Sequence, residues 1–431
     1  MKTSNLLGLN ARTQEYSYRY NKAKGRRIAS SKLYTKKTLA KSGIPVPESY
    51  AKFTKPRSIL NFDWTALPGS FVIKPNTGLG GEGIIVVKKR ARGREGWITT
   101  KKSFVTAPDF QLHVLDILEG AHSLRNEPGV AFVEEYIARH KAFRRYSYRG
   151  TPDIRVIVFN KVPVMAMLRL PTKESGGRAN LHQGAIGVGI DIATGITTHA
   201  VYHGKYIKYK PGTKRKLHGI KIPFWTKILR TSVEAQQASA LGFVSVDFLL
   251  HPEKGPMVLE LNYQPGLQIQ LANRAGLKKR LERVEDLVVR DADHGVNIAK
   301  ALFMAHFADR VRAKEGVRTI STFEEIKIKG TKRGQRKKVI AKVDTGAWRT
   351  SISEGLAREL GLLEPANVLW TKQVKSALGQ EERPVIGLTF WMAGRKVITP
   401  ASVAKRMALK YQVIIGRKNL KGFLVSPEVK K

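Results

Sequence analysis

The sequence predicts an α+β fold followed by a mainly β domain. The chain has 431 residues, which is long for one domain and indicates two or three. In its first part, short β-branched segments bounded by Gly or Pro alternate with helical patterns, as is typical of an α+β fold. From about Ile320 the pattern is almost entirely β. We therefore expect a helical opening segment over residues 1–50, an α+β domain over 51–316 and a smaller β domain over 317–431.

Periodicity and the positions of Gly and Pro predict the individual elements. Residues 1–50 carry helical patterns until Pro45 and Pro47, which stop helix growth. The segment 153–170 is typical of two strands around a tight turn at Asn160 and Lys161. Further strands are expected at 71–76, 83–89, 131–137, 244–250 and 257–262, helices at 231–242 and 291–316, and late β segments at 326–330, 338–346, 384–392, 396–403 and 411–416.

The composition narrows the class of protein. Apolar residues make up 42% of the chain, with 16 Phe, 13 Tyr and 6 Trp, so extensive disorder is excluded. There are no cysteines, which excludes disulfides, thiolate metal sites and thiol catalysis. No apolar run reaches the ~18 residues of a membrane span, and the first 20 residues lack a signal-peptide pattern. We therefore expect a cytoplasmic protein.

The net charge predicts acidic partners. The chain has 77 Lys and Arg against 34 Asp and Glu, a formal charge of +43. Such an excess attracts nucleic acid, a ribosome, nucleotides or an acidic polypeptide. The alternative is that a generally basic proteome or an adaptation to salt accounts for it.

A glycine-rich loop follows the strand predicted at 71–76. Residues 78–83 read GLGGEG and lead into another strand, whereas a dinucleotide-binding loop would lead into a helix. Lys74 stands just before the loop. A flexible glycine loop beside a lysine suits a lid over phosphate groups, because its backbone N–H groups can close on their oxygens. A tight turn at the edge of a sheet is the alternative.

Two carboxylates and an amide lie on the strand pair 244–262. Glu260 and Asn262 point to one face of their strand, because side chains alternate with period two, and Asp247 can lie opposite them. We expect a cation between them, because buried carboxylates repel one another. Oxygen ligands of this kind select Mg²⁺ or Mn²⁺. A polar stripe facing solvent is the alternative.

Basic residues lie on the preceding hairpin and on the segment after it. Asp153, Arg155 and Arg169 stand on the hairpin, and Asn180 follows. Arginines on a sheet face next to a metal and a triphosphate are suited to holding phosphate. Ordinary surface arginines are an equally good interpretation of spacing alone.

Taken together, these segments resemble the ATP-grasp ligases of the α-L-glutamate ligase (RimK-like) type. The likeness covers about 28–275 and is carried by SSKLYTKKTLAKSGIPVP, FVIKPNTGLGGEG, FVEEYI, PDIRVIVFNKVPVMAMLR, RANLHQGA and GFVSVDFLL with EKGPMVLELNYQPGL. The resemblance implies two α+β subdomains that clasp ATP. It also implies an acyl-phosphate reaction that joins a carboxylate and an amine, with glutamate as the amino acid added.

The resemblance also implies roles for individual residues. Lys32 and Lys74 would contact the phosphates of ATP, which Gly78, Gly80, Gly81 and Gly83 would cover. Glu134, Glu135, Tyr136 and Ile137 would form the adenine-binding hinge. Arg155, Arg169 and Asn180 would hold phosphate and acyl-phosphate, and Asp247, Glu260 and Asn262 would hold two Mg²⁺ ions.

Three departures from this family bear on the substrate. Such ligases usually open with a larger α/β domain, whereas only some 40 residues precede GIPVP here. The stretch 138–152 is basic and aromatic, and 189–223 resembles an inserted β-hairpin with a cationic tip. A branch of ATP-grasp proteins found with sugar-transfer genes has a similar opening, LGLNAR, and a similar insertion.

The last domain resembles the retropepsin-like aspartyl proteases. AKVDTGAWRTSIS and YQVIIGRKNLKGFLVSP carry the likeness, over about 320–428. The mechanism needs two carboxylates, and the chain offers Asp344 alone, so activity requires a homodimer. A degenerate domain used for binding or dimerisation is the alternative.

Three functions remain open on the sequence. The first is an ATP-dependent ligase acting on an amino acid, a peptide or an acidic polypeptide tail. The second is a nucleic-acid- or ribosome-binding protein on an ATP-grasp scaffold, favoured by the charge and by aromatic–basic runs at 139–149 and 202–218. The third is an aspartyl peptidase acting as a homodimer.

Overall fold

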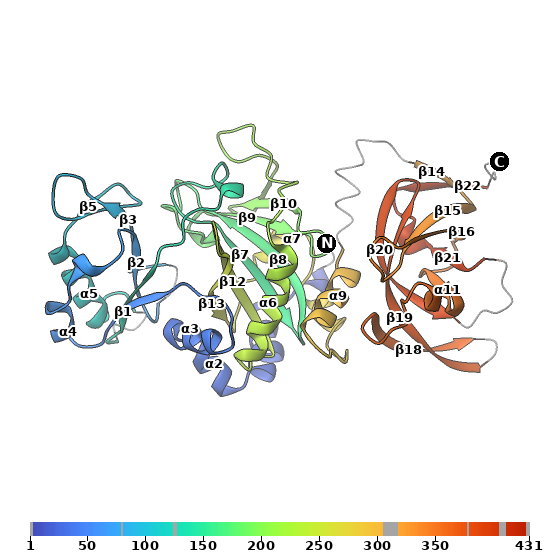
Figure 1. The fold of residues 1–431 in the computed structure, drawn as a ribbon, viewed down its shortest axis with the longest axis horizontal. Coiled ribbons are helices and arrows are strands. Elements are labelled where there is room, and N and C mark those ends of the chain that lie inside the picture. The colour runs from blue at the N-terminus through green and yellow to red at the C-terminus, as the bar shows by residue number, and fades with distance from the viewer. Residues whose placement is uncertain are drawn as a thin grey trace. The chain divides into compact units, whose positions relative to one another are not determined.

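The computed structural model describes residues 3–78, 81–123, 127–304, 318–376, 379–404 and 411–427. The chain divides into two compact units, the first made of residues 1–190 and 196–281 and the second of residues 191–195 and 282–431 (Figure 1). The boundaries expected after residues 50 and 316 stay predictions. Each helix in the described ranges is too short or too polar to cross a lipid bilayer.

The opening segment of the first unit is helical, as predicted. It contains η1 (Thr3–Asn5), α1 (Leu9–Ala11), η2 (Arg12–Tyr18), α2 (Ala23–Ala29) and α3 (Lys32–Lys41). The side chain of Ser31 caps α3 by accepting the backbone N–H of Tyr34 at 3.2 Å. Asn21 ties the segment to the second sheet, because its Nδ2 donates to the Phe243 carbonyl at 2.8 Å and its Oδ1 accepts the N–H groups of Gly242 and Phe243 at 2.9 Å.

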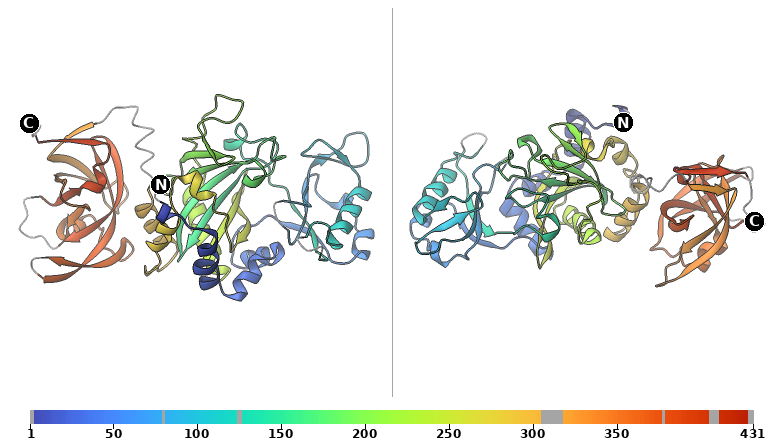
Figure 2. Two further views of the ribbon diagram at one scale, coloured as in Figure 1. Left: turned by 180° about the vertical axis from the view of Figure 1, so that it is seen from behind. Right: turned by 90° about the horizontal axis from the view of Figure 1, so that it is seen from above.

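The first sheet of this unit is antiparallel, with strand order β1-β6-β2-β3-β4-β5. Helix α5 packs on it over a core that contains Phe71, Trp97 and Phe110 (Figures 1 and 2). A capping box of Thr106 and Asp109 begins α5. The elements are β1 (Ser49–Phe53), α4 (Arg57–Leu60), η3 (Trp64–Ala66), β2 (Phe71–Pro75), β3 (Ile85–Arg90), β4 (Trp97–Thr99), β5 (Phe104–Val105), α5 (Ala107–Leu118) and β6 (Ala131–Glu135).

The second sheet is also antiparallel, with strand order β11-β10-β9-β8-β7-β12-β13. The predicted turn between β7 and β8 is confirmed: Asn160 and Lys161 both have positive φ, 48° and 59°, as in the hairpin turn that matches strand twist. The elements are η4 (Lys141–Phe143), β7 (Asp153–Phe159), β8 (Val162–Leu170), η5 (Leu181–Gln183), β9 (Ile186–Ile190), β10 (Thr197–Tyr202), β11 (Lys205–Ile207), α6 (Trp225–Ala238), β12 (Phe243–His251), β13 (Gly255–Asn262), α7 (Ile269–Asn273) and α8 (Lys278–Glu282).

One sequence prediction needs correction here. The helix expected at 231–242 spans Trp225–Ala238 as α6, because the buried residues Trp225, Ile228 and Leu229 already follow the helical period before 231. The insertion expected as a β-hairpin contains the antiparallel pair β10 and β11, and β10 also pairs with β9, so the hairpin extends the main sheet.

The second unit contains a closed barrel. Six strands pair in a ring, β15-β16-β21-β17-β20-β19, which the pairing of β19 with β15 closes. Strand β18 is not part of the ring and pairs with β19. Its core is apolar and includes Ile326, Leu388 and Phe390. The elements are α9 (Ala292–Leu302), β14 (Arg318–Ser321), β15 (Phe323–Lys329), β16 (Arg336–Asp344), β17 (Ser351–Ser353), α11 (Glu354–Glu359), β18 (Val368–Ser376), β19 (Gly379–Met392), β20 (Arg395–Ala404), β21 (Val413–Gly416), η7 (Arg417–Asn419) and β22 (Phe423–Ser426).

The late β segments are confirmed by this barrel. The helix expected at 291–316 is confirmed as α9 up to residue 302, and residues 305–316 lie outside the described part. Asp291 caps α9 by accepting the N–H of His294 at 2.8 Å.

Candidate active site

A row of four charged side chains lies on one face of the second sheet. Asp153 on β7 lies opposite Arg169 on β8, and Arg155 on β7 lies opposite Asp247 on β12. Asp247 is fully buried and accepts N–H groups from Arg155 at 2.8 and 2.6 Å and from Arg169 at 2.6 Å. Arg169 also donates twice to Asp153, at 2.5 Å. Two carboxylates therefore share two guanidinium groups through charge-assisted, bidentate bonds.

Burial and mutual attraction set the pKa values of this row. Burial alone would raise the pKa of Asp247. Attraction to Arg155 and Arg169 outweighs burial and lowers this pKa to about 2. For Asp153 burial outweighs Arg169, and repulsion by Asp247 adds to burial, so its pKa rises to about 6. Burial disfavours the charge of Arg169, yet the two aspartates prevail and raise its pKa. Asp247 is therefore a carboxylate throughout the neutral range.

Glu260 and Asn262 continue the row on β13. Glu260 lies opposite Asp247, and the Asn262 side-chain amide donates to Glu260 Oε1 at 3.2 Å. Both side chains are half-buried. The structure thus brings the three predicted metal ligands together, and their oxygens are of the kind that Mg²⁺ takes.

Arginines, however, already neutralise the buried carboxylate. The sequence predicted a cation between the carboxylates, and in the structure Arg155 and Arg169 supply positive charge at Asp247. Within the described ranges, no group of three or more His, Cys, Asp and Glu side chains is placed to hold a metal ion. The metal-ligand assignment therefore rests on Glu260 and Asn262 beside Asp247 and stays a prediction.

Two buried lysines share one glutamate on the first sheet. Glu134 on β6 forms one ion pair with Lys74 on β2 and another with Lys36 on α3, the latter at 2.6 Å. All three side chains are at most 5% exposed. Burial lowers the pKa of Lys36, and attraction to Glu134 only partly offsets this. The cluster carries one uncompensated positive charge, which suits an anionic ligand.

Lys32 lies within electrostatic reach of both sheets of the first unit. It lies one helical turn before Lys36 on α3, and its ammonium donates to the Asn76 carbonyl at 3.4 Å. Burial lowers the pKa of Lys32, Glu260 and Glu134 oppose that effect, and Lys74 adds to it. Glu260 belongs to the second sheet, whereas Lys74 and Glu134 belong to the first. The charges of both clusters therefore affect the pKa of this one ammonium.

The glycine loop packs against two histidines. Gly78, Gly81 and Gly83 have positive φ, and Gly80 lies outside the described residues. The carbonyl of Gly83 is 2.9 Å from His113 Nε2. A Cβ atom on Gly83 would lie 2.8 Å from the ring of His122, so no side chain fits there without a shift.

The predicted hinge lies at the end of β6. The backbones of Glu134 and Glu135 pair with β1 and β2, and the Ile137 carbonyl accepts the Thr151 hydroxyl at 2.8 Å. Burial raises the pKa of Tyr136. This segment joins the two sheets, as a hinge must.

Asn180 lies on the loop before η5. Its side-chain oxygen caps the N–H of His182 at 3.0 Å. The bonds described for Asn180 are local, so the structure does not by itself join it to Arg155 and Arg169.

Asp344 ends β16 in the second unit. Its Oδ1 accepts the N–H groups of Gly346 at 2.9 Å and Ala347 at 3.0 Å, which forms a tight turn. The following backbone is held by Arg417 and Lys418, whose N–H groups donate to residues 347 and 348 at 2.8 and 3.2 Å.

Cations gather beside this turn. The Arg417 guanidinium lies 4.9 Å from the centre of the Trp348 ring, which is 58% exposed. Burial, together with repulsion by Arg283 and Arg349, lowers the pKa of Lys418 to about 8. The surroundings of the turn are therefore basic.

Two residues of the site were not predicted from the sequence. Lys36 is one turn from Lys32 on the same helix face, and that spacing was the signal available. Asp153, which the sequence places on the hairpin with Arg155, alternates with it on β7, so the two share a sheet face. His113 is far from the loop in sequence, and no local pattern identifies it.

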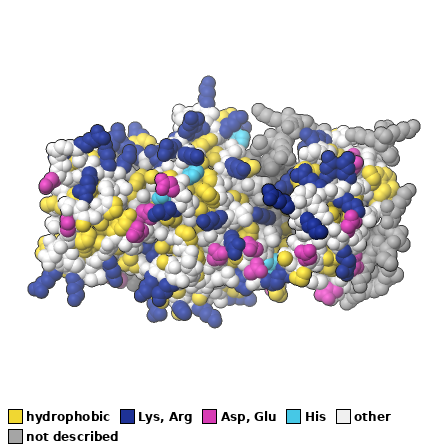
Figure 3. Space-filling model, viewed as in Figure 1, with side chains coloured by type: hydrophobic (Ala, Val, Ile, Leu, Met, Phe, Trp, Pro, Cys, Tyr) yellow, Lys and Arg dark blue, Asp and Glu magenta, His cyan; other side chains and the backbone are white. Residues whose placement is uncertain are grey.

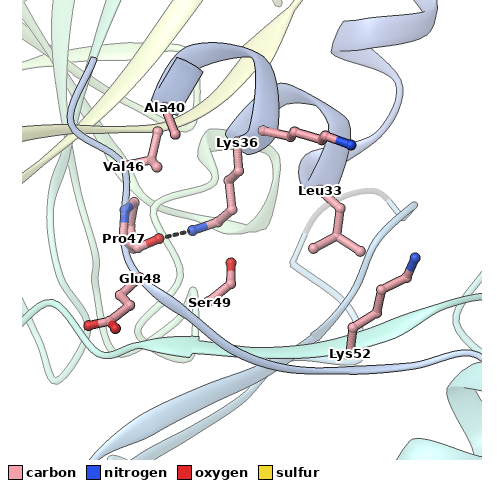
Figure 4. Close-up of a pocket in the computed structure, with 9 residues that line it drawn as sticks. Leu33, Lys36, Ala40, Val46, Pro47, Glu48, Ser49 and Lys52 are labelled. Atoms are coloured by element: carbon pink, nitrogen blue, oxygen red, sulfur yellow. Dashed lines mark hydrogen bonds between the residues drawn. The ribbon is translucent and has the colours of Figure 1, made fainter. Parts of the chain in front are cut away.

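A hollow of about 480 Å³ lies beside α3. Figure 4 shows Lys36 pointing from α3 to the Pro47 carbonyl, with Leu33 and Lys52 on the opposite side of the hollow. The lining contains Lys36 but none of the residues predicted to bind ATP, so we do not assign this hollow to ATP.

Comparison with known families and proteins gives one match in sequence. The family described as sugar-transfer associated ATP-grasp matches residues 11–286. No curated protein matches the chain in sequence.

Several solved structures share low similarity with the chain. The ATP-grasp ligase PsnB with a minimal precursor is 15% identical, with a TM-score of 0.34, and the alignment covers 62% of this chain and 63% of PsnB. The D-alanine–D-alanine ligase of Bacillus anthracis with ATP is 16% identical, with a TM-score of 0.35, over 69% of this chain and 71% of that ligase. The simian foamy virus protease is 24% identical, with a TM-score of 0.18, over 23% of this chain and 90% of the protease.

Proposed function

The chain belongs to the sugar-transfer associated ATP-grasp family, and from this premise we propose that its first unit is an ATP-dependent carboxylate–amine ligase. The position of Lys32 carries the proposal. Its ammonium senses Glu260 of one sheet and both Lys74 and Glu134 of the other. We propose that a triphosphate held at Lys32 lies between the lysine cluster and the carboxylate row.

In the proposed site each group has a role that its charge allows. Lys32 and Lys74 contact phosphate oxygens, while the loop from Gly78 to Gly83 covers them. Residues 134–137 read the adenine through the backbone. Asp247, Glu260 and Asn262 would hold Mg²⁺, two ions in the full site, and bound Mg²⁺ would supply positive charge beside the phosphates.

The proposed reaction needs positioning and charge neutralisation alone. A substrate carboxylate attacks the γ-phosphate of ATP, which releases ADP and forms an acyl-phosphate. An amine then attacks the acyl carbon, phosphate leaves, and an amide forms. Arg155, Arg169 and Asn180 are proposed to hold the phosphoryl oxygens, and Asp153 and Asp247 fix the planes of the two guanidiniums. Glutamate is the amino acid we propose first.

A screen for ADP release tests the proposal. The purified chain with ATP and Mg²⁺ is offered each amino acid, alone and with peptide amines, and the products are weighed by mass spectrometry. We expect ADP release that needs both a carboxylate and an amine, that EDTA abolishes, and that Glu260→Gln lowers by about 100-fold or more. Glu234→Gln, at a partly exposed position of α6, is the control and should not change ADP release. ADP release without an amide product would contradict the ligase.

For the second unit we propose a retropepsin-like barrel. The closed ring of strands and the position of Asp344 at the end of β16 support this proposal. One aspartate cannot perform the reaction, so peptidase activity requires two chains whose Asp344 side chains meet. Sedimentation measures the oligomeric state, and peptide cleavage that Asp344→Ala abolishes would support the peptidase. A monomer that cleaves nothing would restrict the barrel to binding.

A further inference from the structure

Two basic segments of the first unit meet on its surface. Residues 139–149 contain five Lys and Arg, residues 205–216 contain six, and neither segment has an acidic residue. The Lys210 ammonium donates to the Arg145 carbonyl at 3.5 Å, and the Arg215 guanidinium lies 5.6 Å from the ring of Tyr146. We call these two segments the basic surface. On the face drawn in Figure 3, Lys and Arg side chains outnumber Asp and Glu.

Mutual repulsion within the basic surface is not offset locally. Burial lowers the pKa of Lys210, and Arg215 and Arg139 lower it further. Lys205, Lys208, Lys214 and Lys216 are exposed on the hairpin, which lies above β10 in Figure 1. Exposed cations held this close attract a partner of high negative charge density.

The basic surface leads to the glycine loop through one connecting segment, residues 171–178. Glu174 accepts the Tyr202 hydroxyl and lies 2.8 Å from His203 Nε2, which ties that segment to the base of the hairpin. The Tyr148 N–H donates to the Pro171 carbonyl at 2.9 Å, which ties it to the other basic segment. At its far end, the side chain of Arg178 lies 3.6 Å from the place a Cβ atom on Gly81 would take.

Three of the four tyrosines on this surface have cationic partners, and the fourth, Tyr209, is 46% exposed. Arg149 lies 5.2 Å from the centre of the Tyr148 ring, and Arg274 lies 4.9 Å from that of Tyr206. With the Arg215 contact on Tyr146, these rings hold arginines in place. Binding of single-stranded nucleic acid relies instead on aromatic faces open to bases. Because three of the four rings hold arginines, the arrangement favours a partner recognised by charge over one recognised by base stacking.

We propose that the basic surface binds an acidic polypeptide, and that this polypeptide supplies the carboxylate which the site activates. The second clause rests on the proposed ligase function, and the first does not. An acidic polypeptide provides both the negative charge that the surface attracts and the carboxyl group that the reaction consumes. Residues 171–178 give the path from the surface to the phosphates.

Binding to the full-length chain without ATP tests the surface. The probes are a labelled peptide of about ten glutamates and an RNA of about ten nucleotides, titrated at several salt concentrations. We expect the peptide to bind more tightly than the RNA, with an affinity that falls as salt rises. The variant in which Lys205, Lys208, Lys214 and Lys216 become Gln should bind the peptide about tenfold more weakly.

A matched variant controls for net charge. It replaces four exposed lysines of the same unit elsewhere, Lys24, Lys41, Lys55 and Lys89, by Gln. The proposal is supported if this variant changes peptide affinity less than about twofold. It is overturned if both variants lose affinity equally, because the total charge then suffices, or if RNA binds more tightly than the peptide and loses affinity in the hairpin variant.

Turnover separates this proposal from the ligase proposal. In the hairpin variant, kcat with a small free carboxylate should be unchanged, whereas KM for the acidic peptide should rise about tenfold. Specific peptide binding without any ADP release would refute the ligase and leave the surface. ADP release with small carboxylates, without specific peptide binding, would refute the surface and leave the ligase.

Discussion

Replacement of Arg155 by Leu should destabilise the first unit by about 3–5 kcal/mol, because it breaks a buried ion pair and leaves a buried carboxylate. Asp247 accepts three N–H groups, and two of them come from Arg155. The remaining guanidinium, that of Arg169, is shared with Asp153. The pKa of Asp247 is about 2, below its ordinary value of 3.8, so its ionisation contributes about 2 kcal/mol of stability above pH 4. Loss of Arg155 removes most of that contribution.

The sign of the pH dependence follows from the same pKa. In the natural chain the contribution of Asp247 is lost as the pH falls through about 2. In Arg155→Leu the pKa of Asp247 rises, so the folded variant takes up a proton at higher pH. The difference in stability between the two proteins should therefore shrink as the pH is lowered from 7.

Native-state hydrogen exchange measures this loss in the right place. The chain has two units, so global unfolding curves mix them, whereas peptides from β7 and β12 report the first unit alone. Arg230→Leu, which breaks an exposed pair with Glu234 on α6, is the control and should cost less than about 1 kcal/mol. The double variant with Asp247→Leu should regain much of the loss. A cost below about 1 kcal/mol for Arg155→Leu, or a double variant no more stable than the single, would refute the reasoning.

Three further predictions concern stability and nucleotide binding. Asn21→Ala removes the side-chain acceptor of the Phe243 N–H and one of two acceptors of the Gly242 N–H, whose other acceptor is the Tyr20 carbonyl. It should cost about 1–3 kcal/mol in hydrogen exchange of β12 peptides; a cost near zero would contradict the tie between the opening segment and the sheet. Gly83→Ala should weaken ATP binding about tenfold in calorimetry, because its Cβ meets His122; Gly93→Ala, which shares the positive φ but lies in open space, should leave affinity unchanged. Lys418→Met should stabilise the barrel by about 1–2 kcal/mol at pH 7, allowing for solvent screening of the ammonium. The pKa of Lys418 is about 8 in the folded chain and about 10.5 in the unfolded chain, so this gain should fade between those pH values. A gain that stays constant with pH would contradict the prediction.

Local patterns predicted much of the first unit. Strand alternation placed Glu260 and Asn262 on one face, and the structure brings Asp247 opposite Glu260. The turn at Asn160 and Lys161 was also predictable, because a short polar break between two apolar strands requires positive φ at both positions. These features depend on neighbours in sequence.

The partners of those residues could not be predicted from local patterns. Arg155 and Asp247 are 92 positions apart, and only the register of β7 against β12 makes them neighbours. The expectation of an obligatory cation was wrong in its reason, because it counted carboxylates without knowing which arginines would face them. Lys36 was missed for a similar reason, since its partner Glu134 comes from a strand nearly a hundred residues later.

The opening segment has a practical consequence for anyone who shortens this chain. The rings of Tyr16 and Tyr20 lie 5.5 and 4.8 Å from that of Phe159, and Tyr16 also lies 5.7 Å from Phe243. Both phenylalanines lie on the same sheet face as Asp247. Phe243 is the first residue of β12, four positions before Asp247. A chain trimmed to begin at residue 22 would expose a hydrophobic patch on a sheet whose other end carries the charged side chains. Such a chain should aggregate before its activity could be assayed.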